Sequence, residues 1–147
     1  MESNSIHIRP LAESDYDALV ALWVAGGLGI KPAGRESPQA FARQLAEQGE
    51  FMMAAEIRGR LAGVVLGSHD GRKGWANRVA VHPDFRRRGV GAALLHALDC
   101  KFEEHGIQVR AALVFHNNTA SRALFEKCGY TRDEGVTYYS KRPGPDA

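Results

Sequence analysis

Three arginines and two glycines fall within six residues at 86–91, which read RRRGVG. Val79 and Val81 before them alternate as in a strand, and His82-Pro83 ends that strand because proline donates no hydrogen bond to a sheet. An apolar run typical of a helix follows. Free amides at a helix N-terminus attract anions, and arginine offers paired donors to phosphate oxygens. The segment therefore predicts an anion site, with a phosphorylated cofactor as the expected ligand.

Three other interpretations of this segment differ in the residues that they require. A solvated basic turn that merely begins a helix would also carry arginine and glycine. The Walker phosphate loop requires Gly-Lys followed by serine or threonine, which does not occur in this sequence. The dinucleotide fingerprint requires a third glycine where this chain has Leu94. A strand before the turn and a helix after it favour the phosphate site.

Composition indicates an ordinary globular domain. Of the 147 residues, 44% are hydrophobic and 24% are charged, and the net charge of +2 is too small to indicate a nucleic-acid partner. No apolar run approaches the roughly 20 residues of a membrane span, and residues 1–10 lack the apolar core of a signal peptide. The two cysteines have no metal-ligand spacing. We expect a cytoplasmic protein without a metal, bound neither to nucleic acid nor to membranes.

The elements that must position the arginines follow from the periodicity of apolar residues. A short strand at 6–9 precedes a helix that a Ser14–Asp17 capping box begins and Gly26 ends, and Ser37-Pro38 opens a second helix. Residues 26–37 between them hold four glycines and predict a mobile loop. Strands at 51–57, 61–69 and 75–81 should form an antiparallel meander. The later elements are a helix at 89–105, a strand at 109–116 parallel to 75–81, a helix at 120–128 and a last strand at 137–141.

Two segments resemble motifs of one known family. Arg86, Gly89 and Gly91 match motif A of the GNAT acetyltransferases, [Q/R]-x-x-G-x-[G/A]. Motif B, N-x-x-A-x-x-x-L-[Y/F]-E-K-x-G-[F/Y], is matched by Asn117, Ala120, Leu124, Phe125, Glu126, Lys127, Gly129 and Tyr130. The joint occurrence of both motifs about thirty residues apart, with a strand between them, is specific, and the element order agrees along essentially the whole chain.

The resemblance implies an α/β (α+β) GNAT fold. Its central sheet would be mixed and mostly antiparallel, with six to seven strands and about four helices, and one parallel pair of strands would separate at the acetyl-CoA site. Residues 1–141 would form a single domain and 142–147 a flexible tail. The implied activity is N-acetyltransfer from acetyl-CoA directly to a primary amine of a small molecule or peptide, by a monomer or homodimer.

The resemblance also implies which residues hold acetyl-CoA. They lie on the strand before motif A, in the arginine turn and in motif B: Val79, Ala80, Val81, Arg86, Arg87, Arg88, Gly89, Val90, Gly91, Ala92, Asn117, Ala120 and Phe125. Asn117 could equally be only a helix N-cap. Acceptor specificity is expected in the loop 26–37, the first two helices and the last hairpin.

Proton transfer is the part of the chemistry that the sequence assigns least directly. Relatives often place a glutamate on the strand before motif A, whereas this chain has no carboxylate at 75–78. His116 ranks first as general base, ahead of His69 and Asp70, and Asn77 could position a water molecule. Phe125 stands where relatives often carry the tyrosine that protonates the leaving thiolate, so Ser121 could hold a water there instead. Tyr130, Tyr138 and Tyr139 are further candidates.

The two departures keep other functions open. A non-catalytic acyl-CoA sensor or partner-binding module would need neither the glutamate nor the tyrosine. A nucleic-acid binder that uses the arginine cluster would show steep salt dependence and no affinity for CoA.

Overall fold

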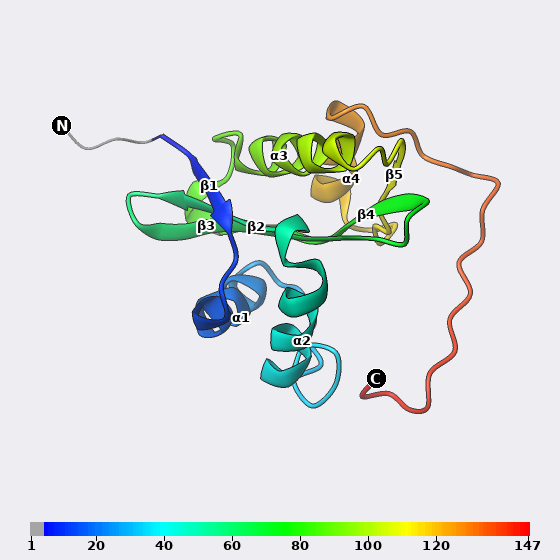
Figure 1. Ribbon diagram of the computed structural model, residues 1–147, viewed down its shortest axis with the longest axis horizontal. Helices are drawn as coiled ribbons and strands as arrows, with labels where there is room; N and C mark the ends of the chain where they lie inside the picture. Colours follow the sequence, from blue (N-terminus) through cyan, green and yellow to red (C-terminus); the bar gives the residue numbers. More distant parts are fainter. Residues whose placement is uncertain (1–4) are drawn as a thin grey trace.

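A mixed sheet of five strands forms the centre of the computed structural model, which describes residues 5–147 (Figure 1). The strands lie in chain order as β1 (His7–Pro10), β2 (Met52–Ile57), β3 (Arg60–His69), β4 (Lys73–Val81) and β5 (Val109–Ala111). The first four pair antiparallel, which confirms the predicted meander, and β4 pairs parallel with β5. The sheet positions the end of β4 beside the helix that follows it.

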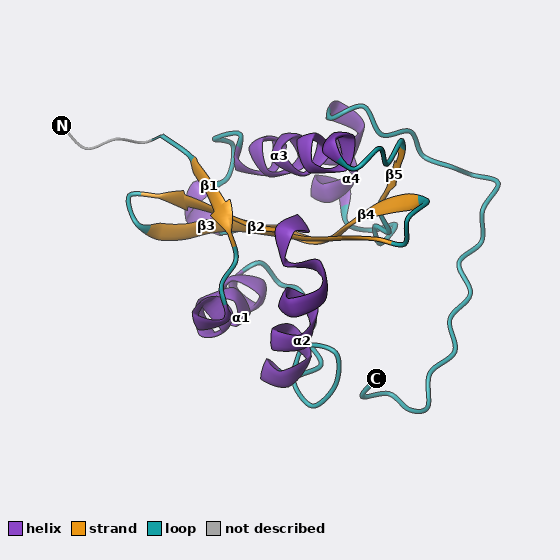
Figure 2. Ribbon diagram, in the orientation of Figure 1, coloured by secondary structure: helices purple, strands orange, loops and turns teal. Residues whose placement is uncertain are grey.

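Four helices cover the two faces of this sheet. Helices α1 (Tyr16–Ala25) and α2 (Pro38–Gln48) lie on one face, and α3 (Val90–Glu104) and α4 (Thr119–Lys127) lie on the other, as Figure 2 shows. Each face has its own apolar core. Trp23, Phe41 and Val64 lie in the first core, and Leu94, Phe102 and Phe125 lie in the second. Among the residues described, no helix is long and apolar enough to cross a membrane.

Helix boundaries confirm one predicted cap and correct another. The Ser37 hydroxyl accepts a hydrogen bond from the Ala40 amide at 3.1 Å, so α2 begins as its Ser-Pro pair predicts. The Ser14–Asp17 capping box is wrong, because a 3₁₀ turn at Glu13–Asp15 precedes α1. Asp15 accepts from the Ala12 amide at 2.7 Å instead.

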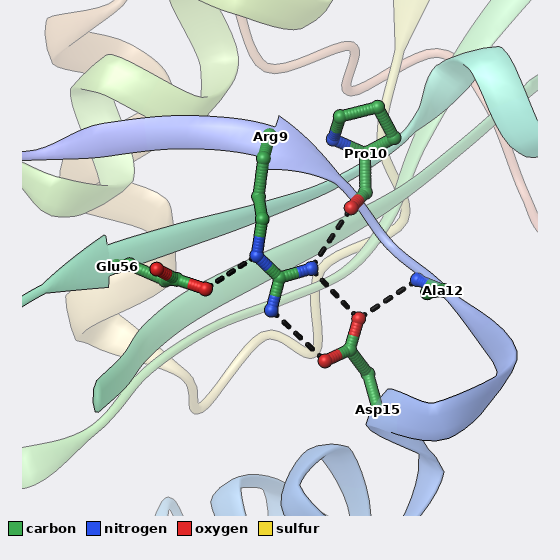
Figure 3. A network of polar contacts seen from close by, with 5 residues as sticks. All are labelled: Arg9, Pro10, Ala12, Asp15 and Glu56. Atoms are coloured by element: carbon green, nitrogen blue, oxygen red, sulfur yellow. Dashed lines mark hydrogen bonds and ion pairs between the residues drawn. The ribbon is translucent and has the colours of Figure 1, made fainter. Parts of the chain in front are cut away.

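Arg9 ties β1 to that turn (Figure 3). Its guanidinium donates two hydrogen bonds to Asp15, at 2.8 and 2.9 Å, and a third bond to Glu56 on the neighbouring strand β2. The paired guanidinium holds the pKa of the Asp15 carboxyl below its usual range. The network therefore fixes where the chain leaves the sheet and enters α1.

The C-terminal third differs most from the sequence prediction. The strand predicted at 109–116 pairs only over Val109–Ala111, and the strand predicted at 137–141 is not formed, so the described sheet has five strands where six to seven were expected. Residues 131–141 instead run extended and exposed away from α4 (Figure 1). Further along, Lys31 Nζ donates to the Pro145 carbonyl at 2.6 Å. This contact places the chain end against the 26–37 loop.

Candidate functional site

A β-bulge interrupts β4 in the middle of the predicted site. Val64 of β3 pairs with Ala80 and Leu66 pairs with Asn77, so Val65 alone faces both Arg78 and Val79. The extra residue is accommodated by Arg78, whose φ of 55° lies in the left-handed region. The neighbours of Arg78 lie on the α1 and α2 side, whereas Val79 packs into the core below α3. The bulge therefore sends Arg78 and Val79 to opposite faces.

The parallel pair separates just beyond its first three residues. β4 pairs with β5 only at Lys73–Trp75, and the six remaining residues of β4, 76–81, have no partner on that side among the described strands. Backbone groups of β4 on this edge are consequently available to an extended ligand. This open edge includes Val79, Ala80 and Val81, which the resemblance implies hold acetyl-CoA.

The arginine turn joins the end of β4 to α3. A 3₁₀ turn at Pro83–Phe85 is followed by three exposed arginines, and α3 begins at Val90 after Gly89. The Ala93 amide donates to the Gly89 carbonyl at 3.0 Å. The amides before Ala93 have no acceptor within the helix, as is usual for the first turn. Gly89 has a φ of 79°, and a Cβ built there would meet no atom within 4 Å. The structure thus brings guanidiniums and a helix N-terminus to one exposed turn.

Gly91 is required by the packing of two helices. A Cβ built on it would lie 2.7 Å from Leu124 Cδ2 of α4, so its small size lets α3 and α4 approach each other. The resemblance to motif A implies that both glycines also hold acetyl-CoA. Gly91 is explained by helix packing, and Gly89 by its backbone conformation.

Motif B forms the start of α4, opposite the end of β5. The N-cap is Asn118, whose side chain accepts from the Ser121 amide at 3.1 Å, so the N-cap alternative for Asn117 is wrong. Asn117, Ala120 and His116 are exposed, and Ser121 is half-buried. The His116 carbonyl accepts from Arg122 at 3.0 Å, and nothing described orients the imidazole. The placement alone does not make His116 a base.

Phe125 is a core residue in this structure. It is 6% exposed and packs edge-on against Tyr130, with ring centroids 4.9 Å apart. Burial raises the pKa of Tyr130 to about 12, so its hydroxyl keeps its proton at neutral pH. Tyr138 and Tyr139 lie exposed on the extended C-terminal segment. Tyr130 is therefore the tyrosine that α4 brings beside position 125.

The remaining polar candidates have structural partners. Asn77 donates to the Ser68 hydroxyl at 3.2 Å across β3 and β4, on the residue before the bulge. His69 and Asp70 belong to the β3–β4 turn, at the opposite end of β4 from Val81, where they accept hydrogen bonds from the Gly71, Arg72 and Lys73 amides. Those amides lower the pKa of the Asp70 carboxyl. Their position at this distant turn separates His69 and Asp70 from the open edge of β4.

Glu36 is the residue that sequence reasoning missed. It lies in the 26–37 loop, is 6% exposed, and places Oε1 3.6 Å from Arg78 at the bulge. The Arg78 guanidinium also lies 4.5 Å from the centroid of the Trp23 ring. The loop therefore supplies, from about forty residues away along the chain, the carboxylate that β4 lacks. The nearest signal in the sequence was the Ser37-Pro38 pair, which directly follows Glu36 and fixes where α2 begins.

A cavity of ≈ 890 Å³ lies on the other side of β5. Residues of β4, β5, α4 and the segments that follow β5 and α4 line it, including Trp75, His116, Phe125 and Tyr130. None of residues 86–91 reaches it. The cavity and the arginine turn are therefore separate features of the surface.

The sequence is similar to that of known acetyltransferases. Residues 16–130 match the family model described as acetyltransferase (GNAT) family. A curated acetyltransferase of Pectobacterium atrosepticum is 30% identical over 132 residues, which cover 90% of this chain and 92% of that protein. A Yersinia enterocolitica acetyltransferase is also 30% identical, with 89% and 92% coverage.

Solved structures agree on the fold. An N-acetyltransferase from Thermoplasma acidophilum, in complex with coenzyme A, has a TM-score of 0.78 at 17% identity and covers 90% of this chain and 93% of its own. An Escherichia coli ribosomal-protein alanine N-acetyltransferase has a TM-score of 0.69 at 25% identity, with 85% and 77% coverage. The family model, the curated relatives and the fold together show that this chain belongs to the GNAT acetyltransferase family.

Proposed function

We propose that this protein is an acetyl-CoA-dependent N-acetyltransferase that moves the acetyl group directly to a primary amine of a small molecule or peptide. The observation that carries the proposal is the open edge of β4, which ends in an arginine-rich turn at the N-terminus of α3. A relative of the same fold has been solved in complex with coenzyme A.

The residues of the turn fit a pyrophosphate. Arg86, Arg87 and Arg88 are exposed, the first amides of α3 have no helical acceptor, and the space beside Gly89 is open. Bound acetyl-CoA would supply a thioester as the acyl donor. Residues 79–81 of β4 would then hydrogen-bond its amide groups along the unpaired edge, as β-strand addition does elsewhere.

The acceptor is proposed to approach from the α1 and α2 side of the sheet. The bulge turns Arg78 toward that side, where the 26–37 loop brings the Glu36 carboxylate. An alkylammonium has a pKa near 10.4, so only about one molecule in a thousand is neutral at pH 7 and a nearby carboxylate would favour its binding. A thiol with a pKa near 8.5 leaves without an obligatory acid, so the phenyl ring of Phe125 is compatible with turnover.

The test combines binding with turnover. Acetyl-CoA consumption would be followed across amino acids, short peptides, polyamines and aminoglycosides, while calorimetry measures CoA affinity. Arg86→Ala should weaken CoA binding about 10- to 150-fold, corresponding to the ~1.5–3 kcal/mol typical of a hydrogen bond to a charged group. Arg72→Ala, an exposed arginine at the β3–β4 turn, is the matched control and should leave the affinity unchanged. Equal CoA affinity in both variants would contradict the proposed site.

A further inference from the structure

The buried side chains of Glu36 and Trp23 and the half-buried side chain of Arg78 form one cluster under the 26–37 loop. Arg78 joins the other two, since its guanidinium lies 3.6 Å from the Glu36 carboxylate and 4.5 Å from the Trp23 ring centroid. Arg35 Nε approaches the second oxygen of Glu36 at 3.4 Å. Two guanidiniums therefore face one carboxylate, and the cluster carries a net positive charge.

Each of the three side chains leaves one buried polar atom without a hydrogen bond. These atoms are Oε2 of Glu36, Nε of Arg78 and Nε1 of Trp23. A buried polar atom that makes no hydrogen bond is destabilising, and Arg35 offsets this only in part for Glu36, as an ion pair without a hydrogen bond. Three such atoms, on two side chains that both contact Arg78 and on Arg78 itself, indicate that the cluster is completed by a ligand. That ligand needs one donor for Glu36 and an acceptor for Arg78 and Trp23.

The covering loop can give a ligand access. Its backbone carbonyls accept two hydrogen bonds from side chains, since the Tyr16 hydroxyl donates to Glu36 at 2.6 Å and Arg78 donates to Gly29 at 2.7 Å. Gly27 has a φ of 77°, and a Cβ on Gly27 or Gly29 would meet no atom within 4 Å. Space is therefore open beside these two glycines, and movement of this part of the loop would expose the cluster on the α1 and α2 side of β4.

We infer that this cluster binds the acceptor amine and selects an α-amino group, with a carbonyl on the neighbouring carbon, as in an amino acid or a peptide N-terminus. The ammonium group donates to Glu36, and the adjacent carbonyl oxygen accepts from Arg78 and Trp23. The positive charge of Arg35 and Arg78 disfavours polyamines and aminoglycosides, which carry several ammonium groups. The inference rests on the proposed transferase function and names its substrate class.

Matched amines test this selection. Alaninamide and isopropylamine share one skeleton and differ in the carbonyl group, while spermidine represents the polycations. We expect kcat/KM, expressed per unprotonated amine, to favour alaninamide at least 10-fold over both. Equal or better use of isopropylamine or spermidine would overturn the inference, and this comparison requires only the wild-type protein.

Variants locate the selection in the cluster. Glu36→Gln should lower kcat/KM for alaninamide at least 10-fold, and Trp23→Phe and Arg78→Lys should reduce the preference over isopropylamine. Glu47→Gln, an exposed glutamate on α2, is the control and should behave as wild type. A Glu36→Gln variant as active as Glu47→Gln would refute the role of Glu36.

Binding measurements separate this inference from the proposed function. Calorimetry of alaninamide with the CoA-loaded protein should show binding that Glu36→Gln weakens at least 10-fold while CoA affinity is unchanged. Absence of CoA binding would contradict the transferase proposal itself. CoA binding with acetyl transfer to spermidine, and none to alaninamide, would refute the α-amino selection alone.

Discussion

Replacement of Gly91 by valine tests whether this motif glycine serves helix packing or ligand approach. A Cβ at position 91 lies 2.7 Å from Leu124 Cδ2, about 0.7 Å inside the 3.4 Å at which ordinary contact begins (3.4 − 2.7). Added methyl groups in a packed core cost about 1–3 kcal/mol. The contacted atom ends a half-buried, flexible side chain, so we expect a loss of about 1–2 kcal/mol from Gly91→Val.

A double-mutant cycle isolates this contact. Leu124→Ala removes the methyl groups that the valine would meet, so Gly91→Val should cost little in that background. The expected coupling free energy is about 1–2 kcal/mol, measured from urea unfolding of the four proteins. For a domain of this size, each kcal/mol corresponds to about 2–4 °C in Tm.

CoA affinity of the same four proteins separates the two explanations. If packing explains Gly91, the double variant should bind CoA as Leu124→Ala does, because the new Cβ points to α4. An equal fall in affinity with and without Leu124, together with no coupling in stability, would refute the packing argument. The ligand would then meet position 91 directly.

Four further predictions concern single positions. Gly89→Ala should lose about 1–2 kcal/mol of stability because its φ of 79° is left-handed, whereas Gly89→Asn should lose less in the same urea titration. Phe125→Ala should cost about 3–5 kcal/mol, since the ring is buried; a loss below 1 kcal/mol in thermal unfolding would contradict its core position. Asp15→Asn should destabilise the protein at pH 7 and match wild type at strongly acidic pH. The lowered pKa of Asp15 gives stability above about pH 4, and this stability disappears as pH falls through the pKa of Asp15 in the folded protein. Urea unfolding midpoints measured against pH test this. Tyr130, with a pKa raised to about 12, should stabilise the fold below about pH 10 and lose that contribution as pH rises toward 12. The absorbance lost in Tyr130→Phe during an alkaline titration should therefore appear well above pH 10, the ordinary pKa of tyrosine.

Local chemistry was sufficient to predict most of the fold. Apolar runs separated by short glycine-containing turns gave the meander of β2, β3 and β4, and the Ser37-Pro38 pair gave the start of α2. The RRRGVG segment gave the turn before α3, because a strand end, a left-handed glycine and a helix N-terminus are encoded within a few adjacent residues. The resemblance of motifs A and B then gave the family.

The C-terminal segment shows where local patterning was insufficient. Residues 137–141 have the composition of a strand, yet a strand also needs a paired edge, and the structure instead directs this segment away from β5. The same limit applies to the helix N-cap, where Asn118 and not Asn117 meets the Ser121 amide. Neighbouring asparagines are alike in sequence and differ only in backbone geometry.

The sequence by itself determined the arginine-rich turn, whose parts are contiguous from β4 to α3. Only the tertiary structure decided which carboxylate stands near the β4 bulge, because Glu36 and Arg78 meet through the packing of the 26–37 loop against α1 and the sheet. It likewise assigned Gly91 to its contact with Leu124. Contacts between distant residues depend on how whole elements pack, and no local pattern in one sequence records that packing.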